Sequence, residues 1–244
     1  MSWSDLGATM ILFAYYLIMC ALIPSALRIY AGVPREWVRK LQHLGYSLSV
    51  FLLIHLFSTW YAAIIGAFSL VIIGYPVLLL LEKTSFYQRV FVDRKPSGGE
   101  LRMQLLLVQL TFALLMFLFW GLMGTRWHFL IPTAVMAWGF GDAAAAVVGK
   151  AFGRRAVVSR FVDGSKTYVG SVAMMMAAAL AIFFTLLVYA GRSWQASLFI
   201  AVLVAPVCAL VELVSRRGLD TITVPLVTAS FMLPMMHIVS YLGW

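Results

Sequence analysis

Two acidic residues lie inside long apolar runs of the sequence. Asp142 lies within the run Trp138–Ala146, and Glu212 lies within the run Cys208–Leu213. If such a run crosses a membrane, a carboxylate in it costs about 2.5–3.5 kcal/mol unless it is paired, binds a metal or faces water. We therefore interpret both residues as parts of a functional site. Carboxylates so placed are suited to binding a divalent cation or to accepting a proton.

The residues around and after Asp142 have a composition suited to phosphate binding. Small residues at positions 139, 141, 143–146, 149 and 153 would let a second helix or a ligand approach the backbone closely. Basic residues follow, and the next helix is predicted to begin near Ser165-Lys166-Thr167. The N-terminus of a helix suits a phosphate group because it presents N–H groups and the positive end of the helix dipole. The same small and basic residues are also typical of ordinary helix packing and ordinary membrane topology.

Membrane helices must position these residues. Of the 244 residues, 63% are hydrophobic and 11% are charged, whereas soluble domains carry about 25% charged residues. A membrane helix needs about 20 apolar residues. This length predicts eight segments, at about 7–30, 43–59, 61–81, 102–122, 127–149, 167–190, 195–215 and 222–242. The sequence thus predicts an all-α polytopic transmembrane bundle, with residues 1–244 as a single catalytic domain.

The basic residues predict how the bundle is oriented. With eight segments, every Lys and Arg except Arg126 and Arg192 falls at the loops after the first, third, fifth and seventh segments. Positive charge is enriched in cytoplasmic loops. We therefore expect these loops and the active site to face the cytoplasm, and both termini to lie on the other side. Membrane topology explains the formal net charge of +9, and we expect no nucleic-acid partner.

The two cysteines, Cys20 and Cys208, both lie in apolar runs. Their number and spacing are typical of neither a disulfide framework nor a metal cluster. We interpret them as lipid-facing or packing residues.

An ordered set of short motifs extends along most of the chain. The central set is Gly141-Asp142, Ala145, Gly149-Lys150, Phe152-Gly153, Lys166-Thr167 and Gly170-Ser171. The flanking set is Arg39-Lys40-Leu41-Gln42-His43, Gly98-Gly99-Glu100, and Glu212 followed by Gly218–Pro225. Over about residues 36–230 the order resembles the signature of the CTP-dependent lipid-alcohol kinases, which include dolichol kinase, phytol kinase and the CTP-dependent diacylglycerol kinase. Thr221 stands where that family usually has Asn, and Val169 where many members have Glu.

The resemblance implies a membrane enzyme that transfers the γ-phosphate of CTP, or of another nucleoside triphosphate, to the hydroxyl of a lipid alcohol, with Mg²⁺ as cofactor. It implies Asp142, Glu212 and Asp220 as metal ligands. The implied catalytic residues are Asp142, Lys166, Asp220, His43 and Glu100. The implied nucleotide-binding residues are Arg39, Lys40, Gly141, Gly149, Lys150, Gly153, Lys166, Thr167, Gly170 and Ser171.

Two other functions remain open. The family is related to the cytidylyltransferase-like membrane proteins, so a CDP-lipid synthase that acts on phosphatidate is one alternative. A transporter whose intramembrane acids carry ions or protons is the other. Against a transporter, the halves of the sequence show no clear repeat, and the charged motifs gather at one predicted face. The choice among polyprenol, phytol-like alcohol and diacylglycerol, the preference for CTP over ATP, the oligomeric state and the membrane also remain open.

Overall fold

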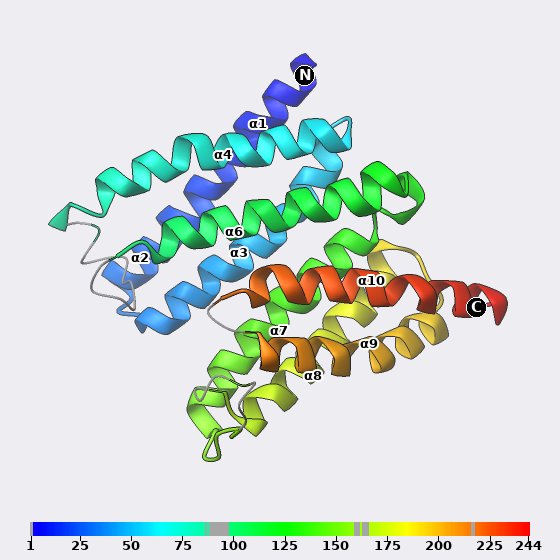
Figure 1. Cartoon of the computed structure of the whole chain (residues 1–244). Helices are drawn as coiled ribbons and strands as arrows, with labels where there is room; N and C mark the ends of the chain where they lie inside the picture. The colour runs from blue at the N-terminus through cyan, green and yellow to red at the C-terminus, as the bar shows by residue number, and fades with distance from the viewer. Residues whose placement is uncertain (1, 86, 88–97, 159–161, 163–165, 216–217) are drawn as a thin grey trace. The chain divides into compact units, whose positions relative to one another are not determined.

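The computed structural model describes residues 2–85, 87, 98–158, 162, 166–215 and 218–244, and these residues are mostly helical. They contain no strand; Ala156 and Thr167 form an isolated antiparallel bridge. The helices are α1 (Trp3–Tyr15), η1 (Tyr16–Leu22), α2 (Ile23–Tyr30), α3 (Arg35–Leu56), α4 (Trp60–Leu81), α6 (Glu100–Leu115), η2 (Met116–Leu122), η3 (Thr125–Trp127), α7 (Leu130–Phe152), α8 (Tyr168–Phe184), η4 (Thr185–Tyr189), α9 (Trp194–Val214) and α10 (Asp220–Tyr241). Figure 1 shows them in chain order from blue to red. The predicted all-α class is confirmed.

Seven helical stretches among the described residues are long and apolar enough to cross a membrane. They are Trp3–Tyr30, Trp60–Leu81, Glu100–Leu122, Thr125–Phe152, Tyr168–Tyr189, Trp194–Val214 and Asp220–Tyr241. These seven and α3 correspond in order to the eight predicted segments. The chain is therefore a multi-pass membrane protein, as predicted from its apolar runs.

The start of α3 differs from the prediction. The helix begins at Arg35, directly after Pro34, whereas the apolar run placed its start at residue 43. A proline before the first helical turn is favourable because its backbone needs no hydrogen-bond donor there. The early turns carry charged residues, so hydropathy alone misses them. Arg39 and Lys40 consequently lie on a helix and not in a loop.

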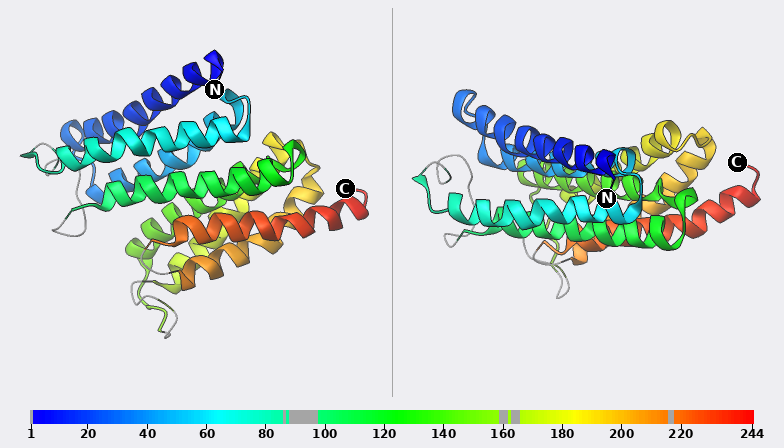
Figure 2. Two further views of the ribbon diagram at one scale, coloured as in Figure 1. Left: turned by 45° about the horizontal axis from the view of Figure 1, so that its top comes forward. Right: turned by 90° about the horizontal axis from the view of Figure 1, so that it is seen from above.

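The first compact unit is Met1–Phe117. Within it, α3 packs against α1, η1 and α2, and α4 packs against α1, α3 and α6 (Figures 1 and 2). Leu12, Leu53 and Val108 are fully buried in this packing. A polar contact also joins three helices, because the Tyr16 hydroxyl lies 3.0 Å from the Ser49 hydroxyl and accepts a hydrogen bond from the Gln109 amide at 2.5 Å.

The second compact unit is Leu118–Trp244. Helix α8 packs against α7 and α9, and α10 packs against α9 and α7. Trp138 on α7 is fully buried, as are Met174 on α8 and Val204 on α9. A Cβ at Gly141 would lie 2.3 Å from the Met174 sulfur, so the small residue lets α7 and α8 approach closely. That the two units form a single catalytic domain stays a prediction.

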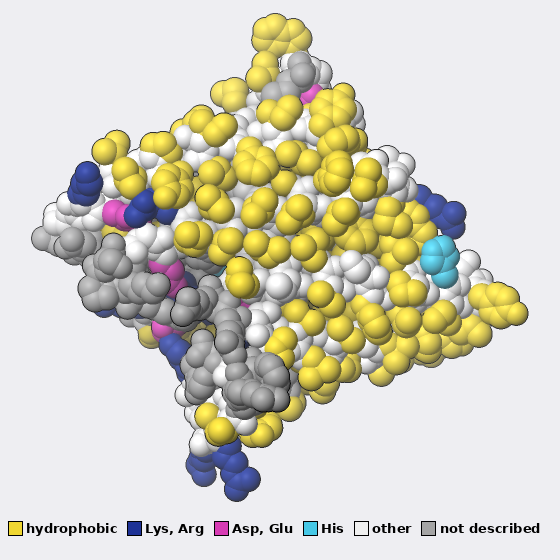
Figure 3. Space-filling view, viewed as in Figure 1, with side chains coloured by type: hydrophobic (Ala, Val, Ile, Leu, Met, Phe, Trp, Pro, Cys, Tyr) yellow, Lys and Arg dark blue, Asp and Glu magenta, His cyan; other side chains and the backbone are white. Residues whose placement is uncertain are grey.

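The helix surfaces are apolar where a soluble protein would be polar. Met10, Ile72 and Val188 are each more than 70% exposed, and Figure 3 shows hydrophobic side chains over the visible faces of the helices. Large apolar patches of this kind are suited to contact with lipid. Both cysteines are buried, so they pack within the protein and do not face lipid.

Candidate functional site

Three carboxylates of the second unit lie together, and we call Asp142, Glu212 and Asp220 the acidic cluster. One side-chain oxygen from each lies within 4.8 Å of the others. Asp142 is on α7, Glu212 is near the end of α9 and Asp220 is the first residue of α10. Gly218, two residues before α10, has φ of 81°, a backbone conformation that favours glycine. Helix α10 packs against both α9 and α7, and the structure gathers all three predicted metal ligands.

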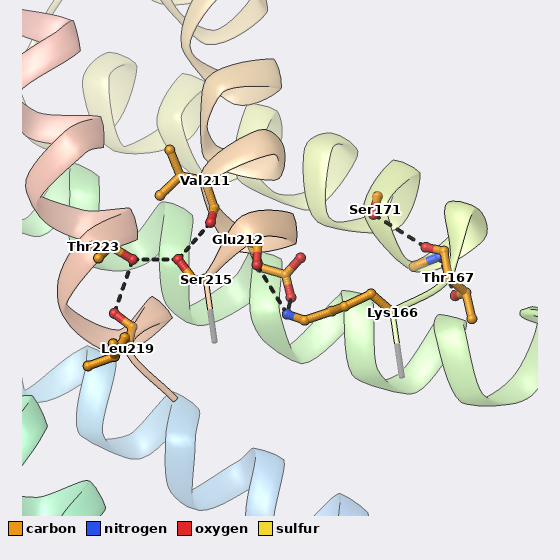
Figure 4. Close-up of polar contacts among 9 residues, drawn as sticks. Lys166, Thr167, Ser171, Val211, Glu212, Ser215, Leu219 and Thr223 are labelled. Carbon is orange, nitrogen blue, oxygen red and sulfur yellow. Dashed lines mark hydrogen bonds and ion pairs between the residues drawn. The ribbon is translucent and has the colours of Figure 1, made fainter. Parts of the chain in front are cut away.

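Lys166 forms an ion pair with Glu212 of the acidic cluster (Figure 4). The Glu212 side chain is only 4% exposed and the Lys166 side chain 22% exposed. The Lys166 ammonium also donates a hydrogen bond to the backbone carbonyl oxygen of Glu212, at 3.2 Å. A carboxylate this deeply buried needs such a partner, because removing the partner from a buried ion pair costs about 3–5 kcal/mol.

Backbone contacts hold Lys166 in place. Val157 N donates to the carbonyl oxygen of Lys166 at 2.8 Å, and Tyr168 N donates to that of Arg155 at 3.4 Å. Thr167 is the N-cap of α8, and its hydroxyl accepts a hydrogen bond from Gly170 N at 3.1 Å. The first turn of α8 therefore begins where the sequence predicted. The N–H groups of Gly170 and Ser171 in this turn already donate hydrogen bonds to Thr167. Side chains would therefore have to supply part of any phosphate contact.

The predicted nucleotide-binding glycines lie where α7 meets the start of α8. A Cβ at Gly149 would lie 3.1 Å from the Thr167 hydroxyl oxygen, and a Cβ at Gly170 would lie 3.1 Å from the carbonyl oxygen of Ala145. A Cβ at Gly153 would lie 2.6 Å from the same Thr167 oxygen. Close helix packing alone therefore explains why these positions lack a side chain. Their contact with a nucleotide stays a prediction.

The remaining central residues lie on the same two helices. Ser171 donates a hydrogen bond to the Thr167 carbonyl oxygen at 3.3 Å. Lys150 is exposed in the last turn of α7, where a positive charge is favourable near the negative end of the helix dipole. Gly141, next to Asp142, packs against Met174.

The first unit gathers another group of predicted residues, on α3 and α6. The Arg39 guanidinium lies 3.0 Å from Glu36 and 4.0 Å from Glu100. Nδ1 of His43 lies 3.1 Å from the Gln104 amide nitrogen, and the His43 side chain is buried. Lys40 is also buried, at 5% exposure. The structure thus brings Arg39 of α3 and Glu100 of α6 together. His43, also on α3, contacts Gln104 of α6.

Sequence reasoning missed several polar neighbours of these groups. The Ser215 and Thr223 hydroxyls lie 2.7 Å apart where α9 meets α10 (Figure 4), and each residue is three positions after a member of the acidic cluster. Gln104, which contacts His43, is four positions after Glu100. Side chains three or four positions apart lie on one face of a helix. A search at these spacings from each acidic residue would have identified the three polar neighbours.

Comparison of the chain with protein-family models, with curated proteins and with solved structures finds no match.

Proposed function

We propose that this protein is a membrane lipid kinase that transfers the γ-phosphate of CTP, or of another nucleoside triphosphate, to the hydroxyl of a lipid alcohol. The main support is the acidic cluster, which joins three carboxylates from three helices and has a lysine bound to one of them. Phosphoryl transfer needs these two kinds of group, because carboxylates bind the divalent cation and cations neutralise the phosphates.

The donor atoms of the acidic cluster suit Mg²⁺. Mg²⁺ prefers oxygen ligands at about 2.0–2.1 Å and is usually held by one or two carboxylates together with phosphate oxygens and water. Ligand oxygens around such an ion lie about 3–4 Å apart, so the separations of up to 4.8 Å would close slightly on binding. When bound, Mg²⁺ would neutralise charge that develops on the transferred phosphoryl group and the leaving group.

The side chains of the second unit would divide the remaining tasks. Asp142 would accept the proton of the lipid hydroxyl while the oxygen of that hydroxyl forms a bond to the γ-phosphorus. The bond from that phosphorus to the β–γ bridging oxygen would break, and CDP would leave with the electron pair. Lys166 and the Thr167 end of α8 would hold the triphosphate by charge and by the helix dipole. The roles that the resemblance implies for Arg39, Lys40, His43 and Glu100 stay predictions.

The positions of two members of the acidic cluster favour an enzyme over a transporter. Glu212 lies two residues before the end of α9, and Asp220 begins α10. Both are therefore at helix ends, although Asp142 lies near the middle of α7, whereas a transport site is expected near the middle of the membrane. By the distribution of basic residues, we propose that this end faces the cytoplasm, where nucleotides are present.

The test uses the purified protein in detergent with Mg²⁺, γ-labelled CTP and a panel of polyprenol, phytol and diacylglycerol. The expected result is label in at least one extracted lipid, and ATP in place of CTP defines the nucleotide preference. A parallel reaction contains α-labelled CTP and phosphatidate. Label that enters lipid only from the α position would replace the kinase by a CDP-lipid synthase. Folded protein that labels no lipid with any of these donors would overturn the proposal.

A further inference from the structure

The ion pair between Lys166 and Glu212 joins two groups to which the proposed function assigns different ligands. Glu212 would bind the divalent cation, whereas Lys166 would bind the nucleotide phosphates. In the structure they bind each other (Figure 4). We infer that Lys166 is an internal counter-ion of the acidic cluster, and that a divalent cation competes with it for Glu212. This inference rests on the proposed function, because it takes the acidic cluster as the cation site.

Charge and burial explain why the ammonium lies on Glu212. Three carboxylates within 4.8 Å repel one another, and burial of Glu212 strengthens that repulsion because little water screens it. The Lys166 ammonium supplies a positive charge where a metal ion would otherwise supply two. A divalent cation on the same carboxylate would repel the ammonium, so the two cations cannot both occupy Glu212 favourably.

Displacement of Lys166 would couple cation binding to nucleotide binding. Lys166 directly precedes Thr167, the N-cap of α8, so its flexible side chain stays beside that helix end when it leaves Glu212. A bound cation would thereby release the ammonium for phosphate, and a bound phosphate would hold it away from Glu212. Because such coupling is reciprocal, each ligand would raise the affinity of the other.

The test measures Mn²⁺ affinity without nucleotide or lipid, by the electron paramagnetic resonance signal of free Mn²⁺. Lys166→Met removes the charge from a side chain of similar length, and should bind Mn²⁺ about 10-fold more tightly than wild type. Lys166→Gln should do the same while keeping a hydrogen-bond donor for Glu212, which protects against misfolding. Lys83→Met, at an exposed position after α4 in the first unit, removes an equal charge and should leave the affinity at the wild-type value.

A Glu212→Gln variant separates the possible failures. If wild type binds Mn²⁺ and Glu212→Gln does not, but both Lys166 variants bind it no more tightly than wild type, competition by Lys166 is wrong and the cation site stands. If neither wild type nor the Lys166 variants bind Mn²⁺, the acidic cluster is not a cation site, and the proposed function fails with the inference.

Discussion

Glu212 illustrates how one charged residue can be kept within an apolar helix. Helix α9 is long and apolar enough to cross a membrane, yet the Glu212 side chain is 4% exposed in it. The cost of burying a carboxylate is offset by the ion pair with Lys166. A pair of this kind adds little to stability compared with apolar residues, so stability alone does not explain why charged residues lie here.

Thr167 is predicted to stabilise the start of α8 through its hydroxyl. The Thr167 oxygen accepts a hydrogen bond from Gly170 N at 3.1 Å, and loss of such a cap costs about 1 kcal/mol. Thr167→Ala should therefore lower the thermal unfolding midpoint in detergent, whereas Thr167→Ser should stay close to wild type because serine also caps. Equal midpoints for the alanine and serine variants would show that the cap does not contribute.

The acidic residues of the candidate site could be predicted from the sequence more readily than the residues that contact them. Asp142 and Glu212 were identified because they interrupt apolar runs, and this signal is local. The pairing of Lys166 with Glu212 joins residues 46 positions apart, which no local pattern specifies. Asp220 was identified through its motif, and its approach to Asp142 depends on how α7 packs against α10.

At the level of helices, close contact between α7 and α8 requires the absence of a side chain at Gly153. A Cβ there would lie 2.2 Å from the Gly149 carbonyl oxygen and 2.6 Å from the Thr167 hydroxyl. Gly153→Ala should lower the free energy of unfolding by about 1–3 kcal/mol, seen as a lower unfolding midpoint. Gly7→Ala is the matched control, because a Cβ at Gly7 meets nothing within 4 Å. An equal midpoint for the two variants would contradict this packing.

The Tyr16 hydroxyl is predicted to hold η1, α3 and α6 together. It contacts Ser49 at 3.0 Å and accepts from Gln109 at 2.5 Å, and both partners are fully buried. Tyr16→Phe would leave buried polar groups without this hydroxyl, at a cost of about 1–3 kcal/mol in the free energy of unfolding. The same change at Tyr30, which is 88% exposed, should have no measurable effect. Unfolding midpoints in detergent compare the two, and equal values would refute the role of Tyr16.

Helix boundaries show where hydropathy succeeds and fails. The predicted starts of α4 and α9 lie within one residue of the structure, because polar residues flank their apolar runs closely. The prediction for α3 was eight residues late, since its first turns carry Arg35, Glu36, Arg39 and Lys40. Pro34 was the available signal, because proline commonly precedes or opens a helix.

At the scale of the whole molecule, the basic residues predict one cytoplasmic face. Cysteines introduced at Lys83 and Arg154 should be protected from a membrane-impermeant thiol reagent applied to intact cells, and those at Arg126 and Arg192 should react. The native Cys20 and Cys208 are buried, so the background should be low. Reaction at Lys83 and Arg154 from outside, with protection at the other two positions, would invert the orientation.

The rate of γ-phosphate transfer from CTP to lipid is the direct measure of whether the acidic cluster is the active site of a lipid kinase. Wild type would be compared with Asp142→Asn, Glu212→Gln and Asp220→Asn, each shown to be folded. Lys83→Met serves as the control, since Lys83 is exposed and lies outside the acidic cluster. We expect transfer by wild type and the control at rates within about twofold of each other, and a loss of at least about 100-fold in each cluster variant. Transfer at the wild-type rate by a folded cluster variant, or no transfer by wild type to any lipid alcohol, would contradict this expectation.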